Sequence, residues 1–326
     1  MKLNSKLAAI NTILSAGIFR KRVPLAIRWQ LTNKCTSKCT YCKIWNSVST
    51  ELTTTQIFSL LNEVKEMGTQ RISFSGGNPL LRKDIGAILE HCKRIGISTG
   101  MNSDGALVPQ KIKELATLDL LKLSLDGPED IHDLTRGKGS YKRVIEAAEV
   151  ARDNHIKFTF ATTLTRYNIR HFGFILKVAE RFNTVVAFQP LKRLYRGVDD
   201  ISSLYPSSSD FKHAIDRLIV VKRTGNRHIR NSLVGLRHIY NWPRYENLKC
   251  GAGIIFCIIE TNGEVKPCDR IKYAAKLPNC LEIGFKKAFD SLPDIRCNGC
   301  GFCGALELNY LLSFNLSIIK DIRELL

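Results

Sequence analysis

Between residues 23 and 196 the chain alternates short apolar runs with longer amphipathic stretches, and this alternation restricts the fold more than any other feature. Runs of strand length occur at 25–29, 71–74, 97–101, 120–125, 156–164 and 184–188. Stretches with helical periodicity occur at 56–67, 83–95, 109–116, 140–154 and 169–182. About six strand–helix units in series predict an α/β fold with parallel strands and right-handed crossovers.

The segments that follow several of the expected strands are polar or rich in glycine. Residues 75–79 read Ser-Gly-Gly-Asn-Pro, 102–105 read Asn-Ser-Asp-Gly, and 126–128 read Asp-Gly-Pro. In TIM-like barrels the loops at the carboxyl ends of the strands form the active-site face. We therefore expect a partial (β/α)6 TIM-like barrel with its site at this end of the sheet.

Outside the expected barrel the pattern changes, and the chain divides into four parts. Residues 1–22 predict an amphipathic helix, residues 23–196 the barrel, and residues 197–249 a helical linker region. Residues 250–326 predict a small cysteine-rich extension. In that extension Thr261-Asn262-Gly263 indicates a β-hairpin, and a last helix begins near Ala305.

The chain is strongly basic, with a net charge of +19 and clusters of Lys and Arg at 192–196 and 222–230. Such a field attracts anions, so we expect an anionic small molecule, lipid, sugar or peptide as substrate. The chain lacks the aromatic-interleaved basic motifs of nucleic-acid modules, so nucleic acid is not expected as a partner. The helix at 1–22 either packs on the barrel or makes a peripheral contact with an anionic membrane.

Eleven cysteines are distributed unevenly along the chain. No secretion signal precedes them, and short spacings between cysteines indicate metal ligands in a reducing cytoplasm rather than disulfides. Cys92 and Cys257 lie in an expected helix and strand and are assigned to packing, whereas Cys280 is a surface residue or a substitute ligand.

The first cysteine group follows the first expected strand with the spacing Cys35-x3-Cys39-x2-Cys42. Iron–sulfur clusters prefer soft thiolate ligands. Three thiolates hold three irons of a cubane and leave the fourth iron open for a small molecule. A structural zinc or iron site with a fourth ligand from elsewhere is the alternative.

This motif, with Tyr41 as the aromatic residue before the third cysteine, resembles the signature of the radical S-adenosylmethionine (radical SAM) superfamily. The resemblance implies an enzyme with a [4Fe–4S] cluster whose open iron binds S-adenosylmethionine. Reductive cleavage of that cofactor gives a 5′-deoxyadenosyl radical, which abstracts hydrogen from the substrate. An external electron donor such as flavodoxin or ferredoxin is implied as well.

Further segments resemble the family's motifs in the same order. The resemblance assigns cofactor binding to Tyr41, Gly76, Gly77, Asn78, Pro79, Asn102, Ser124, Asp126 and Arg136. Asn78 departs from the pattern, because the family has glutamate there and asparagine lacks the charge. On that basis Asn78→Glu is expected to tighten S-adenosylmethionine binding or leave it unchanged.

The second cysteine group resembles the auxiliary-cluster extensions of the SPASM and twitch subfamilies. Its members are Cys250, Cys268, Cys297, Cys300 and Cys303. The resemblance implies one auxiliary [4Fe–4S] cluster bound by Cys250, Cys268 and two of the other three. A zinc ribbon is the alternative reading of the same spacings.

Three functions follow from these patterns. The first is a radical SAM enzyme acting on an anionic small molecule, lipid or sugar with the help of the auxiliary cluster. The alternative is a radical SAM enzyme that matures ribosomal peptides. A noncatalytic iron–sulfur carrier is the third, and it leaves the S-adenosylmethionine-like segments unexplained. The patterns do not decide between oxidoreductase, lyase and transferase chemistry.

Overall fold

The computed structural model describes residues 21–192, 200–245, 248–295, 297 and 300–313. One sheet runs through this part of the chain in the order β6-β5-β4-β3-β2-β1-β7-β8. Its strands are β1 Ala26–Thr32, β2 Arg71–Gly76, β3 Ser98–Ser103, β4 Leu120–Ser124, β5 Phe158–Leu164, β6 Val186–Pro190, β7 Phe256–Ile259 and β8 Val265–Lys266. Strands β1 to β6 pair in parallel with their sequence neighbours, which confirms the partial (β/α)6 barrel.

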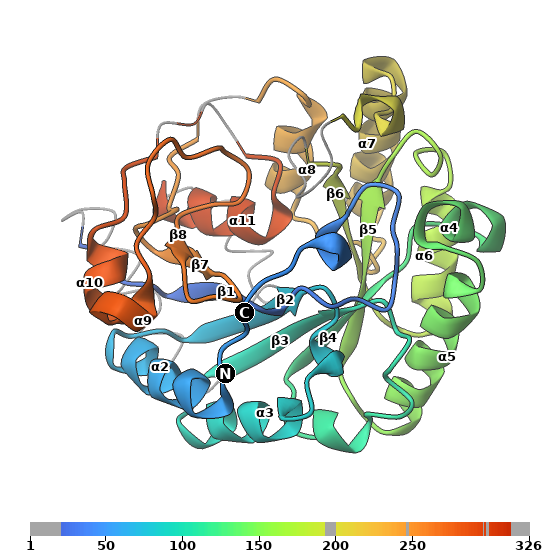
Figure 1. The fold of residues 1–326 in the computed structure, drawn as a ribbon. Coiled ribbons are helices and arrows are strands. Elements are labelled where there is room, and N and C mark those ends of the chain that lie inside the picture. The colour runs from blue at the N-terminus through green and yellow to red at the C-terminus, as the bar shows by residue number, and fades with distance from the viewer. Residues whose placement is uncertain (1–20, 193–199, 246–247, 296, 298–299, 314–326) are drawn as a thin grey trace.

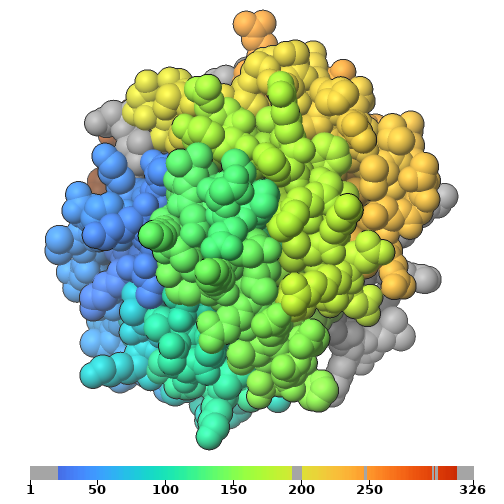
Figure 2. Space-filling model, turned by 90° about the vertical axis from the view of Figure 1, so that its right-hand side faces the viewer, coloured from blue at the N-terminus to red at the C-terminus, as the bar shows by residue number. Residues whose placement is uncertain are grey.

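Helices cover the outer face of the sheet, as Figure 1 shows. This outer layer includes α2 Thr54–Glu66, α3 Ile85–Arg94, α5 Ser140–Asp153 and α6 Phe172–Arg181. The remaining helices are α4 Glu129–Arg136, α7 Ser208–Arg223, α8 Leu233–Tyr240, α9 Cys280–Ile283, α10 Phe285–Asp290 and α11 Cys303–Leu312. Single 3-10 turns are η1 Ile44–Asn46, η2 Pro79–Leu81, η3 Lys113–Leu115 and η4 Ser202–Leu204. Figure 2 shows the face of the molecule that α4, α5 and α6 cover.

Local signals explain where several of these helices begin. Thr53 and Gln56 form the expected capping box at the start of α2, with each side chain bonded to the backbone of the other. The structure shortens the helix expected at 109–116 to η3 and adds α4, which the sequence pattern did not indicate. Helix α4 has only eight residues and follows Pro128, so it is too short for a helical periodicity to be recognised in the sequence.

Alternate residues of the strands face opposite sides, and the two sides differ in chemistry. Side chains such as Trp29, Phe74 and Phe160 point toward the helices and are buried in the main core. The opposite face carries polar or small residues, among them Ser73, Thr159 and Ala187, which line an internal cavity of about 400 Å³. The interior of an ordinary TIM barrel is filled by branched apolar side chains, so this lumen is built to receive a ligand.

The C-terminal extension completes one side of the barrel. The expected hairpin forms as β7 and β8, and β7 also pairs in parallel with β1. Helix α11 contacts both β6 and α8, and several of its residues line the cavity. Cys280 was expected at the surface or as a substitute ligand. It is buried at the start of α9, so the surface placement was wrong, and a role as a ligand stays a prediction.

Cys92 in α3 and Cys257 in β7 are buried, as expected. The helix expected at 1–22 lies outside the described residues, apart from its last two positions, so its membrane contact stays a prediction. In the described part of the chain no helix is long and apolar enough to span a bilayer.

Candidate functional site

The loop that carries the first three cysteines leaves the carboxyl end of β1 and runs to η1. Cys35, Cys39 and Cys42 are partly buried on it. Burial raises the pKa of the Cys35 thiol to about 11 and that of Cys39 to about 12, and the neighbouring thiols add to both shifts. The three sulfur atoms are therefore electrostatic neighbours, as a shared cluster requires.

Two glycines at the end of β2 allow this loop to lie against the sheet. A Cβ on Gly76 would stand 2.1 Å from the carbonyl oxygen of Thr32, and one on Gly77 would stand 1.9 Å from that of Lys34. The backbone N–H of Gly77 donates to Thr32 and that of Asn78 donates to Lys34, each at 2.8 Å. The fold itself therefore requires glycine at both positions, because any side chain would push the cysteine loop away from the sheet.

Asp104, in the loop after β3, fastens the cysteine loop from the other side. Its carboxylate accepts hydrogen bonds from the hydroxyls of Thr36 and Ser37, which lie between the first two cysteines. It also accepts from Asn78 Nδ2 at 2.8 Å and from the backbone N–H of Ala106 at 3.2 Å. Asn78 therefore donates toward a carboxylate, a role that glutamate cannot fill.

A buried ion pair supports the third edge of the loop. Arg136 Nε donates to Asp126 Oδ2 at 2.5 Å, and Tyr41 donates its hydroxyl proton to the same oxygen at 3.2 Å. Arg136 also approaches Cys39, with 3.9 Å between Nη1 and Sγ. Burial acts to lower the pKa of Arg136, but Asp126, Tyr41 and Cys39 outweigh it, so Arg136 is a permanent cation beside a cysteine sulfur.

The structure brings the residues assigned to cofactor binding to the carboxyl end of the barrel. Asn102, Ser124 and Arg136 line the cavity. The remaining members of the set lie around the cysteine loop: Tyr41, Gly76, Gly77, Asn78, Pro79 and Asp126. Their contacts with a cofactor stay a prediction, whereas their contacts with the loop are direct.

Four of the five cysteines of the second group come together. Burial raises the pKa of Cys250 to about 12, with smaller contributions of the same sign from Cys300, Cys268 and Cys297. Cys300 responds in turn to Cys268 and Cys297. Because Cys250 interacts with the other three thiols and Cys300 with two of them, these four side chains are electrostatic neighbours.

Cys303 takes a different position from the other four. Its thiol donates to the carbonyl oxygen of Phe188 at 2.8 Å and accepts from Asn231 Nδ2 at 3.3 Å. It also lines the barrel cavity. The geometry therefore favours Cys297 and Cys300 over Cys303 as partners of Cys250 and Cys268.

The donor sets fit iron–sulfur clusters in their chemistry. Three cysteines, Cys35, Cys268 and Cys300, each accept a backbone N–H from the residue two positions ahead, at 3.4–3.5 Å. Hydrogen bonds to sulfur tune such clusters, and a bound metal displaces the thiol proton that burial retains. Among the described residues no group of three or more His, Cys, Asp or Glu side chains stands close enough to share one metal ion.

Sequence patterns missed the charge inside the barrel. The cavity is lined by the basic side chains of Arg28, Arg71, Lys122, Arg136, Lys192, Arg230 and Arg270. Its acidic residues are Asp269, which pairs with Arg28 and with Lys192 at 2.6 Å, and Glu307, which accepts from Ser232. The available signal was the single basic residue in each of two otherwise uncharged strands, Arg28 in β1 and Lys122 in β4. Because alternate residues of a strand face opposite sides, each of these positions could have been assigned to the face away from the apolar core.

Gly77→Ala tests the close approach of the two loops. We expect it to destabilise the loop by about 1–3 kcal/mol through overpacking and to lower the iron bound after anaerobic reconstitution. Gly173→Ala is the control, because a Cβ there meets nothing within 4 Å and alanine favours helix α6. Equal iron content in both variants would show that the backbone contact does not hold the cysteine loop.

Asn78→Glu is now expected to do harm, the reverse of the expectation from the family motif. In the present structure Asn78 Nδ2 donates to Asp104 Oδ1 at 2.8 Å. Glutamate at this position would place a second carboxylate next to Asp104, and the two like charges would repel each other. We expect about tenfold weaker binding of S-adenosylmethionine, or about 1.4 kcal/mol, together with reduced iron content. The double variant Asn78→Glu/Asp104→Asn should restore both quantities, and a single variant that binds as tightly as wild type would refute the account.

Comparisons with known proteins agree with this geometry. Residues 29–179 match the family model of the radical SAM superfamily. The chain is similar to the mycofactocin maturase MftC of Mycobacterium ulcerans, with 24% identity over 299 residues, which cover 86% of this chain and 80% of that protein. It is also similar to the AdoMet-dependent heme synthase of Nitratidesulfovibrio vulgaris, with 24% identity over 268 residues, 74% of this chain and 72% of the relative.

Solved structures share the fold. SuiB of Streptococcus suis, bound to S-adenosylmethionine, has a TM-score of 0.69 at 16% identity and covers 86% of this chain and 69% of its own. The protein anSMEcpe, solved with AdoMet and the Cp18Cys peptide, has a TM-score of 0.65 at 20% identity and covers 91% and 99%. Motif, barrel and family model agree for residues 29–179, so this part of the chain matches the radical SAM superfamily, whose enzymes use a [4Fe–4S] cluster and S-adenosylmethionine.

Proposed function

We propose that this radical SAM enzyme abstracts hydrogen from an anionic small molecule held in the barrel lumen, with the help of an auxiliary [4Fe–4S] cluster. The observation that carries the proposal is the lining of the cavity, where cationic side chains far outnumber acidic ones. A low-dielectric space with an excess of one charge favours a ligand of the opposite charge.

In this proposal Cys35, Cys39 and Cys42 hold the S-adenosylmethionine cluster. When bound, that cluster supplies the electron that splits the sulfonium cofactor into methionine and the hydrogen-abstracting 5′-deoxyadenosyl group. Arg136 places a fixed positive charge beside Cys39, which favours the thiolate form. Asn102 and Ser124 line the cavity near the carboxyl ends of β3 and β4, where they are suited to orient the cofactor.

The second cysteine group is proposed to hold the auxiliary cluster through Cys250, Cys268, Cys297 and Cys300. The mutual interactions of these thiols support a complete set of four ligands. Full ligation suits electron transfer, so we assign this cluster a redox role next to the lumen. Cys268, a member of this group, lines the cavity together with its neighbours Asp269 and Arg270. An external donor such as flavodoxin or ferredoxin is proposed to supply electrons.

A peptide substrate is the second candidate, and the relatives favour it. SuiB has been solved bound to the precursor peptide SuiA, and the PqqA peptide cyclase of Bradyrhizobium diazoefficiens is 28% identical over 167 residues, 48% of this chain and 43% of that protein. The heme synthase among the relatives is named for a product that is not a peptide. The basic lumen would accept an acidic side chain of a peptide, so the two candidates share the charge requirement.

Cofactor cleavage tests the enzymatic assignment. Anaerobically reconstituted protein with S-adenosylmethionine and dithionite is expected to release 5′-deoxyadenosine and methionine, measured by chromatography. Cys39→Ala should abolish release because the cluster loses a ligand, whereas Cys92→Ala, in the core side of α3, should retain it. Release by the Cys39 variant at the wild-type rate would contradict the proposal.

Metal analysis tests the ligand set of the auxiliary site. We expect about eight irons per chain in the wild type and about four after replacement of Cys250, Cys268 and Cys300 by alanine. Cys303→Ala should keep the wild-type iron content, because its thiol bonds to Phe188 and Asn231 instead. Zinc in place of the second four irons would establish the zinc-ribbon alternative.

A further inference from the structure

Four cations gather in the part of the lumen that lies farthest from the cysteine loop. Arg71 is the first residue of β2, and Arg230 bonds through its backbone N–H to Val186, the first residue of β6. Arg28 and Lys122 are the third residues of β1 and β4. All four side chains line the cavity near the amino ends of the parallel strands.

Gly100 shows how closely two of them approach each other. A Cβ on this β3 residue would stand 3.8 Å from Arg71 Nη2 and 3.8 Å from Lys122 Cε. The missing side chain leaves space at the point where the guanidinium group and the lysine side chain converge. Both Arg71 and Lys122 line the cavity.

Lys122 is the informative member of this group. Its ammonium donates to the hydroxyl of Ser73 at 3.1 Å, and in the described part of the chain no carboxylate forms a salt bridge with it. Burial lowers the pKa of Lys122 well below its ordinary value, and Arg71, Arg230 and Arg28 lower it further. A buried ammonium that faces three guanidinium groups is stabilised when an anion enters among them.

No acid of the cavity forms a salt bridge with Lys122 in the described part of the chain, and only arginines shift its pKa as charged neighbours. Asp269 is engaged by Arg28 and Lys192, and Glu307 accepts hydrogen bonds from the backbone and hydroxyl of Ser232. Asp119, which interacts with Arg71, bonds to the backbone N–H of Thr99 at 2.7 Å. Lys122 is therefore left with like charges and one neutral hydroxyl.

We propose that the amino end of the lumen is an oxyanion-binding site, in which Lys122, Arg71 and Arg230 bind a carboxylate or phosphate group of the substrate. The guanidinium group of arginine binds carboxylate and phosphate through paired hydrogen bonds, and the lysine ammonium attracts both as a compact positive charge. The site anchors the far end of the ligand and leaves its other end toward the cysteine loop. That the bound anion belongs to the substrate rests on the proposed function, whereas the anion site itself does not.

The test measures anion binding to the full-length, anaerobically reconstituted protein, with inorganic pyrophosphate and citrate as the two probes. We expect both to raise the thermal unfolding midpoint of the wild type by several degrees. Lys122→Met should weaken binding at least tenfold by calorimetry. It should also raise the midpoint of the anion-free protein, because it removes a buried and repelled charge.

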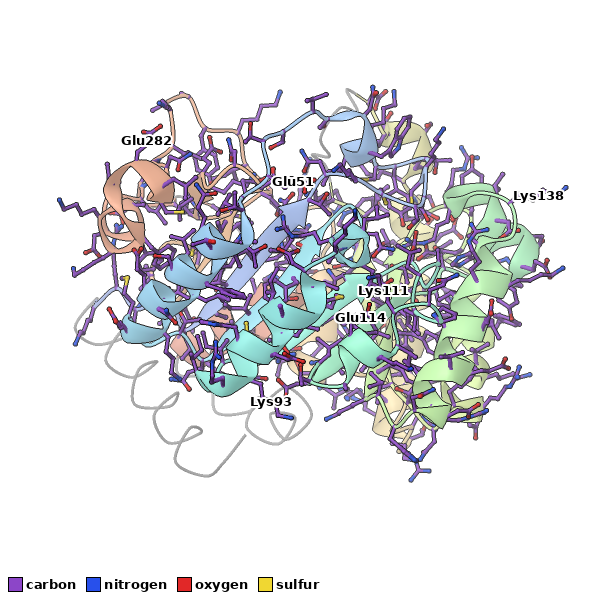
Figure 3. The ribbon with its side chains drawn as sticks, turned by 60° about the horizontal axis from the view of Figure 1, so that its bottom comes forward. Glu51, Lys93, Lys111, Glu114, Lys138 and Glu282 are labelled. Atoms are coloured by element: carbon purple, nitrogen blue, oxygen red, sulfur yellow. The ribbon has the colours of Figure 1, made fainter. Side chains whose placement is uncertain are left out.

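The control is Lys93→Met on helix α3, whose side chain is exposed on the outside of the barrel (Figure 3). It should bind both anions as the wild type does. A Lys122→Met protein that is less stable without anion, or that binds the anions as tightly as wild type, would overturn the site. A response to pyrophosphate but not to citrate would point to phosphate, and the reverse to carboxylate.

The two proposals fail separately. Wild-type protein that binds anions through Lys122 but releases no 5′-deoxyadenosine would keep the site and remove the enzymatic assignment. Protein that cleaves S-adenosylmethionine and shows no anion binding would keep the assignment and remove the site.

Discussion

The backbone contact between the end of β2 and the segment after β1 holds the rest of the site in place. Gly76 and Gly77 lie so close to the carbonyl oxygens of Thr32 and Lys34 that no side chain fits between them. This contact sets where the cysteine loop leaves the sheet, and Asp104 and Arg136 then fix the loop from two further directions. Three neighbouring parallel strands thus converge on one loop, as the carboxyl ends of parallel strands do.

Charge inside the barrel is the second organising feature. A protein does not retain cations in a low-dielectric interior without compensation, because desolvation disfavours them strongly. Asp269 compensates Arg28 and Lys192 near the auxiliary cysteines, and Asp126 compensates Arg136 near the first cluster. At the amino end of the lumen Lys122 bonds to the hydroxyl of Ser73 and, in the described part of the chain, forms no salt bridge with a carboxylate, so the proposed ligand would compensate its charge. The distribution of charge therefore distinguishes Arg28, Lys192 and Arg136, which have carboxylate partners, from Lys122, which has a hydroxyl partner.

The order of elements could be predicted from the sequence because it depends on local information. Alternating apolar runs indicated the six parallel strands, and capping signals such as Thr53 and Gln56 placed a helix start correctly. Helix α4 and the shortened η3 were missed because such brief segments have too few residues to show a period. The pairing of β7 with β1 was also missed, because residues separated by more than two hundred positions leave no local signal of their contact.

By itself the sequence determined the chemistry of this protein: three thiolates at a spacing that suits a cubane, a second thiolate group, and a surplus of positive charge. Only the tertiary structure decided how these groups combine. It set Cys303 apart from the other four cysteines, gave Asn78 a carboxylate to bond to, and directed lysine and arginine from seven separate segments into one cavity. The physical reason is that composition and spacing act along the chain, whereas charge, burial and hydrogen bonding depend on which distant residues the fold brings together.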